Sequence, residues 1–359
     1  MRLPLAASFI AAVFVLVVVF PPRSIIREVQ RSSLAFLEQR WVNSVTPDTA
    51  AASPDAQWLV SAKSVQLLQY LTFKRKKWSW VGGATINPDL RKKTLALIHQ
   101  WPEELQAYMQ QRVTQVLIVS NFGASGYILT NDNQHFTILI DESVIGITPN
   151  AWFRMKESTI VNTEATGHTL QHRIEADSVD LPERLLEGIL IHELAHCIGI
   201  SEGWTTDVPG RIEGLPVSLR FFEGVFTLPA ARPVMHEELR ERFPQLRYYG
   251  HQPQMTVPQY AGLLGELRAS EFPTLYSTVS DLEFFAECVY AFVHCDIQDR
   301  PLSYTVVSGQ DTVVHVSSPL SRIEQSGKAE MVNEILHKLR LRYVNKPSNQ
   351  KTSDDIPTD

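Results

Sequence analysis

The chain has 359 residues but only three cysteines, too few to build a disulfide framework. It also lacks an excess of charge of one sign, because 33 lysines and arginines stand against 39 aspartates and glutamates, for a net charge of −6. This mixed charge argues against a nucleic-acid-binding protein, which needs a positive surface. Internal repeats are absent. With 44% hydrophobic residues, the chain can bury a core in one large domain or two small ones.

Residues 3–20 form one uninterrupted run of apolar or small side chains, closed by Pro21 and Pro22. A helix of this length spans about 27 Å, roughly the hydrocarbon core of a bilayer. The run ends in three valines and a phenylalanine, whereas a cleaved signal peptide has small residues before its cleavage site. The sequence therefore predicts a single-pass membrane anchor, with a cleaved signal peptide as the alternative.

The side of the membrane on which the rest of the chain lies is less clear from the sequence. Arg23, Arg27 and Arg31 follow the apolar run and favour a cytoplasmic position. Large domains, however, are translocated largely regardless of such charges. We expect the extracytoplasmic side by a small margin.

The remainder divides into a membrane-proximal helix and linker (24–56), a main domain (57–345) and a disordered tail (346–359). The basic run 74–77 is interpreted as a solvated loop, with contact to a membrane surface as the alternative. In the main domain, periodicity predicts helices followed by strands, and hence an α+β fold. The predicted helices span 55–73, 87–101, 102–112 and 329–343, and the predicted strands span 113–120, 125–130 and 135–146. Residues 203–275 are irregular and are interpreted as an insertion or lid.

The stretch "IHELAHC" contains His192, Glu193 and His196 in the pattern HExxH. It lies near the end of an amphipathic helix, for which Asp180 is the expected cap and Gly199 the expected stop. Two histidines one turn apart face the same side, and neutral imidazoles are good zinc ligands. Between them, Glu193 can take a proton from a metal-activated water without binding the metal. The alternative is a solvent-exposed pair of histidines.

A catalytic zinc site needs a third protein ligand, and two glutamates compete for this position. Glu202 fits the extended frame HExxHxxGxxE, in which a turn around Met235 could lie below the metal. Glu283 lies in "YSTVSDLEFFAECVYAFV", a helix with Ser280 or Asp281 as cap. A glutamate in so hydrophobic a helix needs a compensating positive charge, and Glu287 one turn on could hydrogen-bond a ligating imidazole.

The segment from Tyr276 to Glu287 resembles the zinc-binding helix of anthrax-toxin lethal factor. The pairing of HExxH with a distant "EFFA" helix resembles the Mlc-titration-factor peptidases, and both groups are gluzincin-type zincins. The resemblance implies a zincin-like fold in which a single Zn²⁺ is bound by His192, His196 and Glu283. It also implies that Tyr276 assists the transition state and that Glu287 is a supporting carboxylate. The spacing from His196 to Glu283 is longer than in those relatives.

Together these features predict a membrane-anchored zinc peptidase with Glu193 as general base and a peptide or protein as substrate. Two alternatives remain: a catalytically silent zincin-fold binding module, and a peptidase that uses Glu202 as third ligand. The motifs do not distinguish an endopeptidase from an aminopeptidase. Residues 135–142 could form an edge strand for an extended peptide, but an ordinary core strand is the favoured interpretation.

The remaining cysteines and histidines are expected to be structural. Cys197, Cys288 and Cys295 are interpreted as small buried hydrophobic residues, with a Cys197–Cys288 bridge as the alternative. The pair His168 and His172 is expected in a polar loop. His294 is expected to have a structural role.

Overall fold

The structure is a computed structural model that describes residues 58–61, 81–130, 135–162, 168–205, 219–227, 234–250, 253–308 and 311–345. Four predictions fall outside these residues: the anchor (3–20), the helix and linker (24–56), the basic run (74–77) and the tail (346–359). Among the helices that the structure does describe, none has the length and hydropathy needed to cross a bilayer.

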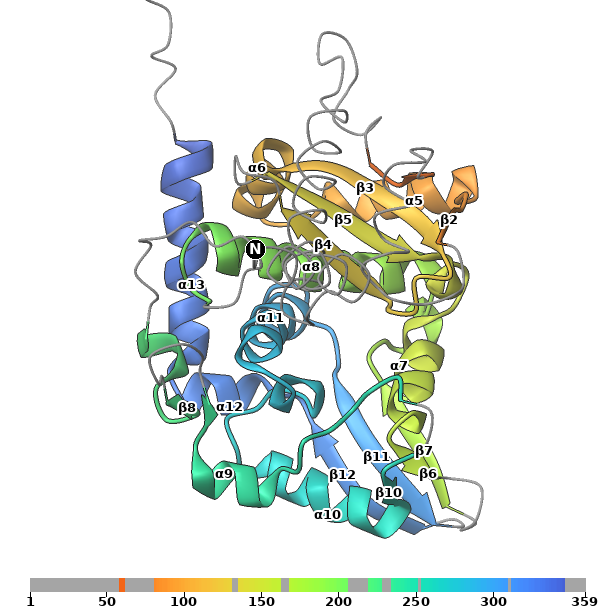
Figure 1. The fold of residues 1–359 in the computed structure, drawn as a ribbon, viewed down its shortest axis with the longest axis vertical. Helices are drawn as coiled ribbons and strands as arrows, with labels where there is room; N and C mark the ends of the chain where they lie inside the picture. The colour runs from red at the N-terminus through yellow and green to blue at the C-terminus, as the bar shows by residue number, and fades with distance from the viewer. Residues whose placement is uncertain are drawn as a thin grey trace, which may run out of the picture.

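A five-stranded mixed sheet forms the upper part of the molecule in Figure 1. Its strands are β1 (Val60–Ser61), β2 (Gly82–Gly83), β3 (Val113–Ser120), β4 (Gly126–Thr130) and β5 (Phe136–Asp141). β3 and β5 pair in parallel, and β4 pairs antiparallel with β5 and forms an edge. The interpretation of residues 135–142 as an ordinary core strand is confirmed and the alternative of an edge strand is wrong, because β5 is internal and all six of its residues are buried.

Two helices flank this sheet, α5 (Pro88–Ile98) and α6 (Glu103–Arg112), close to their predicted bounds. Asn87 caps α5, since its side chain accepts a hydrogen bond of 2.8 Å from the Asp89 amide. The prediction of a helix over 55–73 is wrong where it can be compared. Val60 and Ser61 pair in parallel with β3, next to the buried Trp58 and Leu59.

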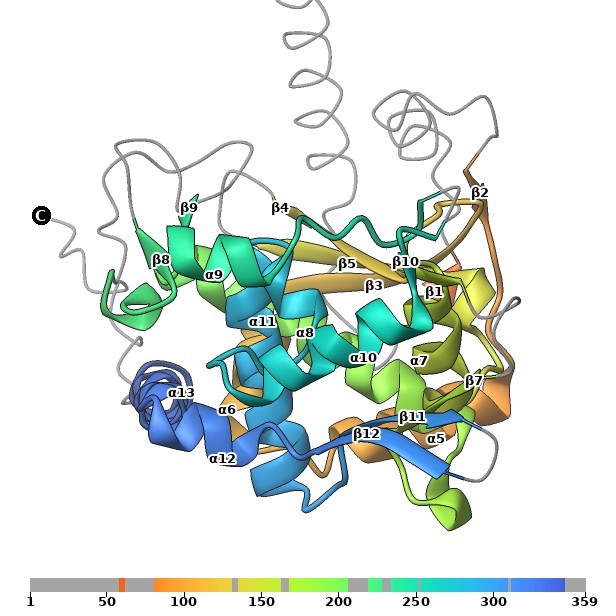
Figure 2. The same cartoon turned by 90° about the horizontal axis from the view of Figure 1, so that it is seen from below.

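The long helix α8 (Pro182–Ser201) contacts β4 and β5 and runs between the sheet and α11 (Asp281–Phe292) (Figures 1 and 2). Ser280 caps α11 through a hydrogen bond from the Glu283 amide. Asp180 does not cap α8, because its carboxylate accepts a hydrogen bond from the Asn150 amide instead. Gly199 does not end α8 either; it lies inside the helix, against Phe285 of α11.

A second, three-stranded antiparallel sheet lies in the lower part of Figure 1, with the strand order β12-β11-β7. It consists of β7 (His168–Arg173), β11 (Ser303–Ser308) and β12 (Asp311–Ser317). The prediction of a polar loop around His172 is wrong. Leu170, His172 and Ile174 alternate with more exposed residues and are all buried, which is the periodicity of a half-buried strand.

Several elements connect these layers. They are α7 (Pro149–Ser158), β6 (Val161–Asn162), β8 (Phe226–Thr227), β9 (Val234–Met235), α9 (Glu237–Arg242), β10 (Met255–Thr256), α10 (Val257–Arg268), α12 (Leu320–Gln325) and α13 (Lys328–Leu339). The region 203–275 thus contains α10, whose capping box joins Thr256 and Gln259. Its buried side chains, such as Phe221 and Tyr260, belong to the same core cluster as α8 and α11.

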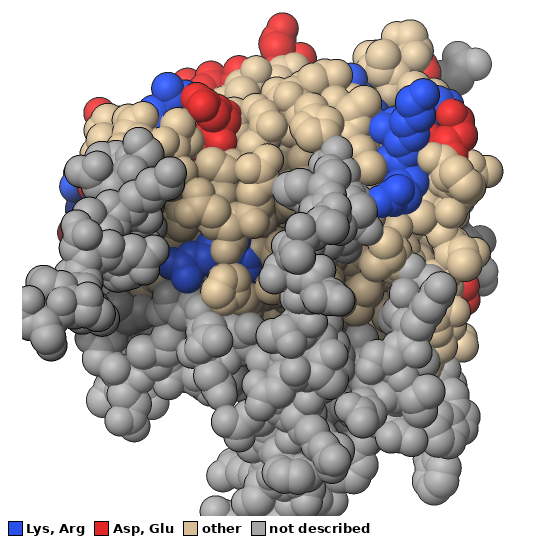
Figure 3. Space-filling model, turned by 90° about the horizontal axis from the view of Figure 1, so that it is seen from above, with Lys and Arg blue, Asp and Glu red and all other residues tan. Residues whose placement is uncertain are grey.

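Small sheets combined with many helices confirm the predicted α+β class. All three cysteines are buried and free, so Cys197 and Cys288 are not bridged. On the face shown in Figure 3, the described residues of either charge sign form only small groups, which are set among uncharged residues. This distribution fits the mixed charge of the sequence.

The close approach of α8 to α11 gives a stability prediction. A Cβ at position 199 would lie 2.9 Å from Thr205 Cγ2 and 3.1 Å from the Phe285 ring, so Gly199→Ala should destabilise the fold by about 1–3 kcal/mol. Gly262 in α10 is a matched control, because a Cβ there meets no atom within 4 Å. Gly262→Ala should be neutral or stabilise by up to about 1 kcal/mol. Denaturant unfolding measures both, and equal effects of the two substitutions would contradict the packing described here.

Candidate metal centre

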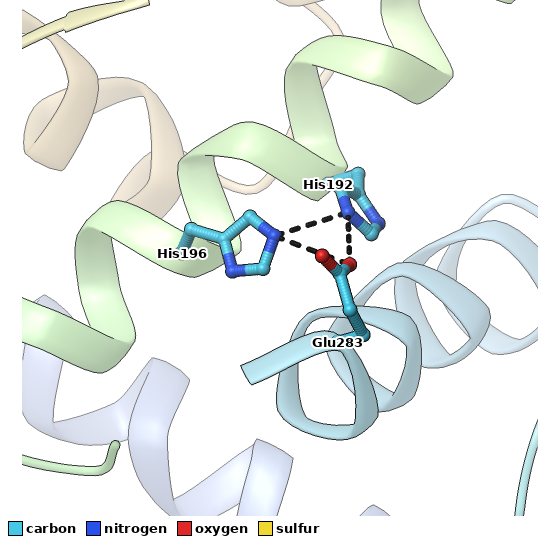
Figure 4. A group of neighbouring side chains, drawn as sticks. All are labelled: His192, His196 and Glu283. Carbon is cyan, nitrogen blue, oxygen red and sulfur yellow. Dashed lines mark hydrogen bonds and ion pairs between the residues drawn. The ribbon is translucent and has the colours of Figure 1, made fainter. Parts of the chain in front are cut away.

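The two HExxH histidines and the first glutamate of α11 converge on one point (Figure 4). His192 and His196 lie one turn apart on α8, and Glu283 projects towards them from the first turn of α11. The two Nε2 atoms are 3.1 Å apart, and Glu283 Oε2 lies 3.1 Å from His192 Nε2 and 3.4 Å from His196 Nε2. The three side chains are still 11–19% exposed, so the cluster remains accessible from one side.

These separations fit a tetrahedral metal ion. Ligand bonds of about 2.05 Å at tetrahedral angles place neighbouring donor atoms roughly 3.3 Å apart. The observed spacing of the three donor atoms is 3.1–3.4 Å. Two imidazole nitrogens and one carboxylate oxygen can therefore hold a metal ion here.

The electrostatics of the cluster also favour a cation. Burial alone would raise the pKa of Glu283, but the two histidines together hold it well below its usual range. Burial alone would lower the pKa of His192, but Glu283 and Glu287 raise it to about 10. Glu283 therefore stays ionised, and the two carboxylates stabilise a positive charge at His192, which is the charge that a bound cation would supply.

Glu287 contacts the far nitrogen of one of the two histidine rings. Its Oε1 lies 3.0 Å from His192 Nδ1, on the side of the ring opposite the cluster, and its Oε2 accepts a hydrogen bond of 2.7 Å from Thr274. Burial tends to raise the pKa of Glu287, but Lys156 and His192 hold it below its usual value. An ionised carboxylate at Nδ1 holds that nitrogen protonated and leaves Nε2 free to bind a metal.

Glu202 lies at the end of α8 and takes no part in this cluster. Its carboxylate instead accepts hydrogen bonds from Tyr343 and Arg342. The structure thus brings Glu283, and not Glu202, to the two histidines.

Glu193 lies beside the cluster and lines a pocket. His192, Glu193, Tyr276 and Glu287 all line this pocket. The Glu193 side chain is buried, and burial raises its pKa. The edge strand β4 passes so close that a Cβ on Gly126 would overlap the Glu193 carboxylate. Only glycine lets the strand approach this closely.

Tyr276 lies on the same pocket wall. Its ring centroid is 6.1 Å from that of His192 and 5.0 Å from that of Tyr248. Burial raises the pKa of its phenol well above the usual value, so the hydroxyl keeps its proton as a hydrogen-bond donor.

Sequence reasoning missed several residues of this pocket, including Gly126, Trp152, Lys156 and Tyr249. Tyr249 has a positive φ of 59°, and its hydroxyl lies 3.2 Å from Ser125 Oγ. None of these residues belongs to a motif. Phe153, Lys156 and Glu157 do share the buried side of α7. Their helical spacing is a local signal that this face of the helix packs against the rest of the protein.

The other histidines of interest lie in the core. His172 Nε2 pairs with the Tyr260 hydroxyl at 3.0 Å, and burial lowers the pKa of His172 to about 3. His294 Nε2 lies 2.9 and 3.0 Å from the carbonyls of Ile174 and Pro301, which agrees with its expected structural role.

Comparison of the chain with known protein families, with curated proteins and with solved structures finds no match.

The choice of third ligand can be tested by metal content. Glu283→Ala removes one of three donors, so metal affinity should fall by more than the roughly 100-fold that loss of a supporting hydrogen-bond partner can cost. Glu202→Ala is the matched control and should retain one metal per chain, since its carboxylate binds elsewhere. Elemental analysis of the purified full chain measures both. Loss of metal in the Glu202 variant alone would overturn the assignment.

The role of Glu287 gives a separate prediction. Glu287→Gln keeps an acceptor for Thr274 but removes the negative charge at His192 Nδ1, so metal affinity should fall about 10- to 100-fold. Glu334→Gln, which removes an exposed carboxylate paired with Lys338, is the control. Competition with a chelator measures the affinities, and an unchanged value in the Glu287 variant would rule out this orienting role.

Proposed function

We propose that this protein is a zinc-dependent peptidase with a zincin-like catalytic domain. The observation that carries the proposal is the convergence of His192, His196 and Glu283 from two distant helices, with the buried Glu193 beside them in an open pocket. Two imidazoles and one carboxylate form a donor set suited to catalytic zinc, which needs a further position open to solvent. A purely structural metal site would not need a pocket or the extra carboxylate.

A zinc ion in this site would polarise the scissile carbonyl and make a bound water more acidic. Glu193 takes the proton of the attacking water on its carboxylate and passes it to the leaving amine. Its raised pKa, caused by burial, suits a group that must both accept and release this proton. The Tyr276 hydroxyl donates a hydrogen bond to the developing oxyanion.

The edge strand β4 is the element that fits an extended substrate. It borders the pocket through Gly126 and forms one edge of the upper sheet. A peptide could add to this edge through main-chain hydrogen bonds, which would bring its backbone past Glu193. The less favoured alternative for residues 135–142 is thus assigned to β4 instead.

The proposal includes the anchor at residues 3–20, which rests on the sequence alone. The catalytic domain would then be tethered to a membrane, with the extracytoplasmic side favoured. Peptides or proteins are the expected partners.

Glu193→Gln tests the peptidase reaction against the alternative of a silent binding module. The glutamine keeps the size of the side chain but cannot accept the proton, so cleavage should fall by about 10²- to 10⁴-fold while metal content stays unchanged. Mass spectrometry of a peptide mixture incubated with the full chain measures cleavage, and elemental analysis measures metal. Glu202→Gln is the control and should cleave at the wild-type rate. A wild-type chain that holds metal and binds peptides without cleaving them would favour the binding module.

A further inference from the structure

We propose that Lys156 forms an anion-binding subsite of this pocket that receives a carboxylate of the peptide substrate. The carboxylate is either an acidic side chain or the free C-terminus. This inference rests on the proposed peptidase function and deepens it, because it assigns a substrate class to the pocket.

Lys156 is a buried lysine that lines the pocket. It lies on α7, its residue surface is 3% exposed, and its ammonium is 3.6 Å from the centre of the Tyr276 ring. The indole of Trp152 and the ring of Tyr248 follow at 5.0 and 5.6 Å. A ring face attracts a cation, but it cannot satisfy three N–H donors as a carboxylate does.

The ammonium has no ionic partner in the part of the chain that the structure describes. Against the effect of burial, the Lys156 charge lowers the pKa of Glu157, Glu193 and Glu287, but none of the three carboxylates forms an ion pair with it. Glu157 accepts hydrogen bonds from Tyr248 and Tyr260, while Glu287 contacts His192 and Thr274. The Lys156 ammonium makes no ion pair or hydrogen bond with any described residue.

Two other cations show how unusual this is. Lys328 is equally buried, but its ammonium donates to the Glu223 carbonyl and pairs with Glu271 at 3.4 Å. Arg184 lines the same pocket as Lys156 and is already paired with Glu187. Lys156 is therefore the cation of this pocket whose donors remain available.

The ammonium keeps some solvent-accessible surface. Some buried polar atoms, such as His172 Nδ1, have neither a hydrogen-bond partner nor contact with solvent, and the Lys156 ammonium is not one of them. A largely desolvated ammonium that keeps some accessible surface in a pocket can attract an anion, because a charged partner there meets little competition from water.

The distance to the metal centre sets which substrate group can reach Lys156. Both lie near Tyr276, with the ammonium 3.6 Å and the His192 ring 6.1 Å from its centroid, and these distances limit their separation. An extended peptide advances about 3.3 Å per residue, so the subsite lies within about three residues of the scissile bond. An Asp or Glu in that range, or a chain end in that range, can therefore reach the ammonium.

The test uses the full chain and matched peptides. Cleavage sites are first located in a peptide mixture by mass spectrometry. Each substrate is then made with Glu or Gln at the three positions on either side of the bond, and with a free or amidated C-terminus. We expect kcat/KM to be roughly 10- to 100-fold higher for the acid than for the amide in either the side-chain comparison or the C-terminus comparison. The comparison that shows this difference identifies the source of the carboxylate. Equal rates throughout would overturn the subsite and leave the peptidase function standing.

Lys156→Met keeps an unbranched apolar chain but removes the charge, so the acid-over-amide ratio should fall to near one. Lys338→Met is the matched control, since Lys338 also lies over an aromatic ring, 4.8 Å from the centre of Trp204, and does not line the pocket. It should keep the wild-type ratio. If Lys156 had only a structural role, its substitution would lower both rates together without changing their ratio.

If the methionine variant does not fold, Lys156→Arg replaces it. The arginine keeps the positive charge, so the preference for the acid over the amide should remain. A folded arginine variant that cleaves the amide normally but has lost this preference would contradict the charge-based account.

If no peptide is cleaved, the peptidase proposal fails, and binding decides the subsite separately. The probes are acetyl-Ala-Ala-Glu-Ala-Ala-amide, its Gln counterpart, and acetylated pentaalanine with a free or amidated end. Calorimetric titration of the wild-type chain should then show tighter binding of one acid than of its amide, with the difference lost in Lys156→Met. Equal affinities would overturn the subsite as well.

Discussion

The packing of α8 against α11 is the contact on which everything else in this protein depends. Eighty-seven positions of chain separate His196 from Glu283, yet their side chains meet because the two helices share one buried core. The approach is close enough to require glycine at position 199, opposite Phe285. Apolar burial thus supplies the free energy that holds three polar donors together before any ion compensates their desolvation. A small change in the position of either helix would separate the donor atoms.

Three glutamates near this contact differ in role because their surroundings differ. Glu283 faces two imidazoles, which hold its pKa well below the usual range despite burial. Glu287 faces Thr274 and the far nitrogen of His192, where it can fix the orientation of the ring. The Glu193 carboxylate is buried without a hydrogen bond to any described residue, and burial raises its pKa. In the proposed enzyme, one residue type would thereby supply a ligand, an orienting group and a proton acceptor.

Local elements were predictable where local physics decides them. Asn87 and Ser280 cap helices in the expected way, because capping needs only a short side chain and the next two or three amides. Other expectations failed where a distant partner competes. Asp180 accepts a hydrogen bond from Asn150 and so does not cap α8. His172 lies in a buried strand because β11 pairs alongside it, and its partner Tyr304 is 132 positions away, outside any local window.

The sequence alone determined which side chains could form the site: HExxH sets two imidazoles on one helix face, and a glutamate in an apolar helix needs a positive partner. These are properties of a single helix with its fixed periodicity, so they can be derived without coordinates. Only the tertiary structure decided between Glu202 and Glu283, made β4 and not β5 the edge of the sheet, and placed Lys156 without an ionic partner in the pocket. Each of these depends on contacts between segments far apart in the chain, whose geometry is set by packing and not by local backbone preference.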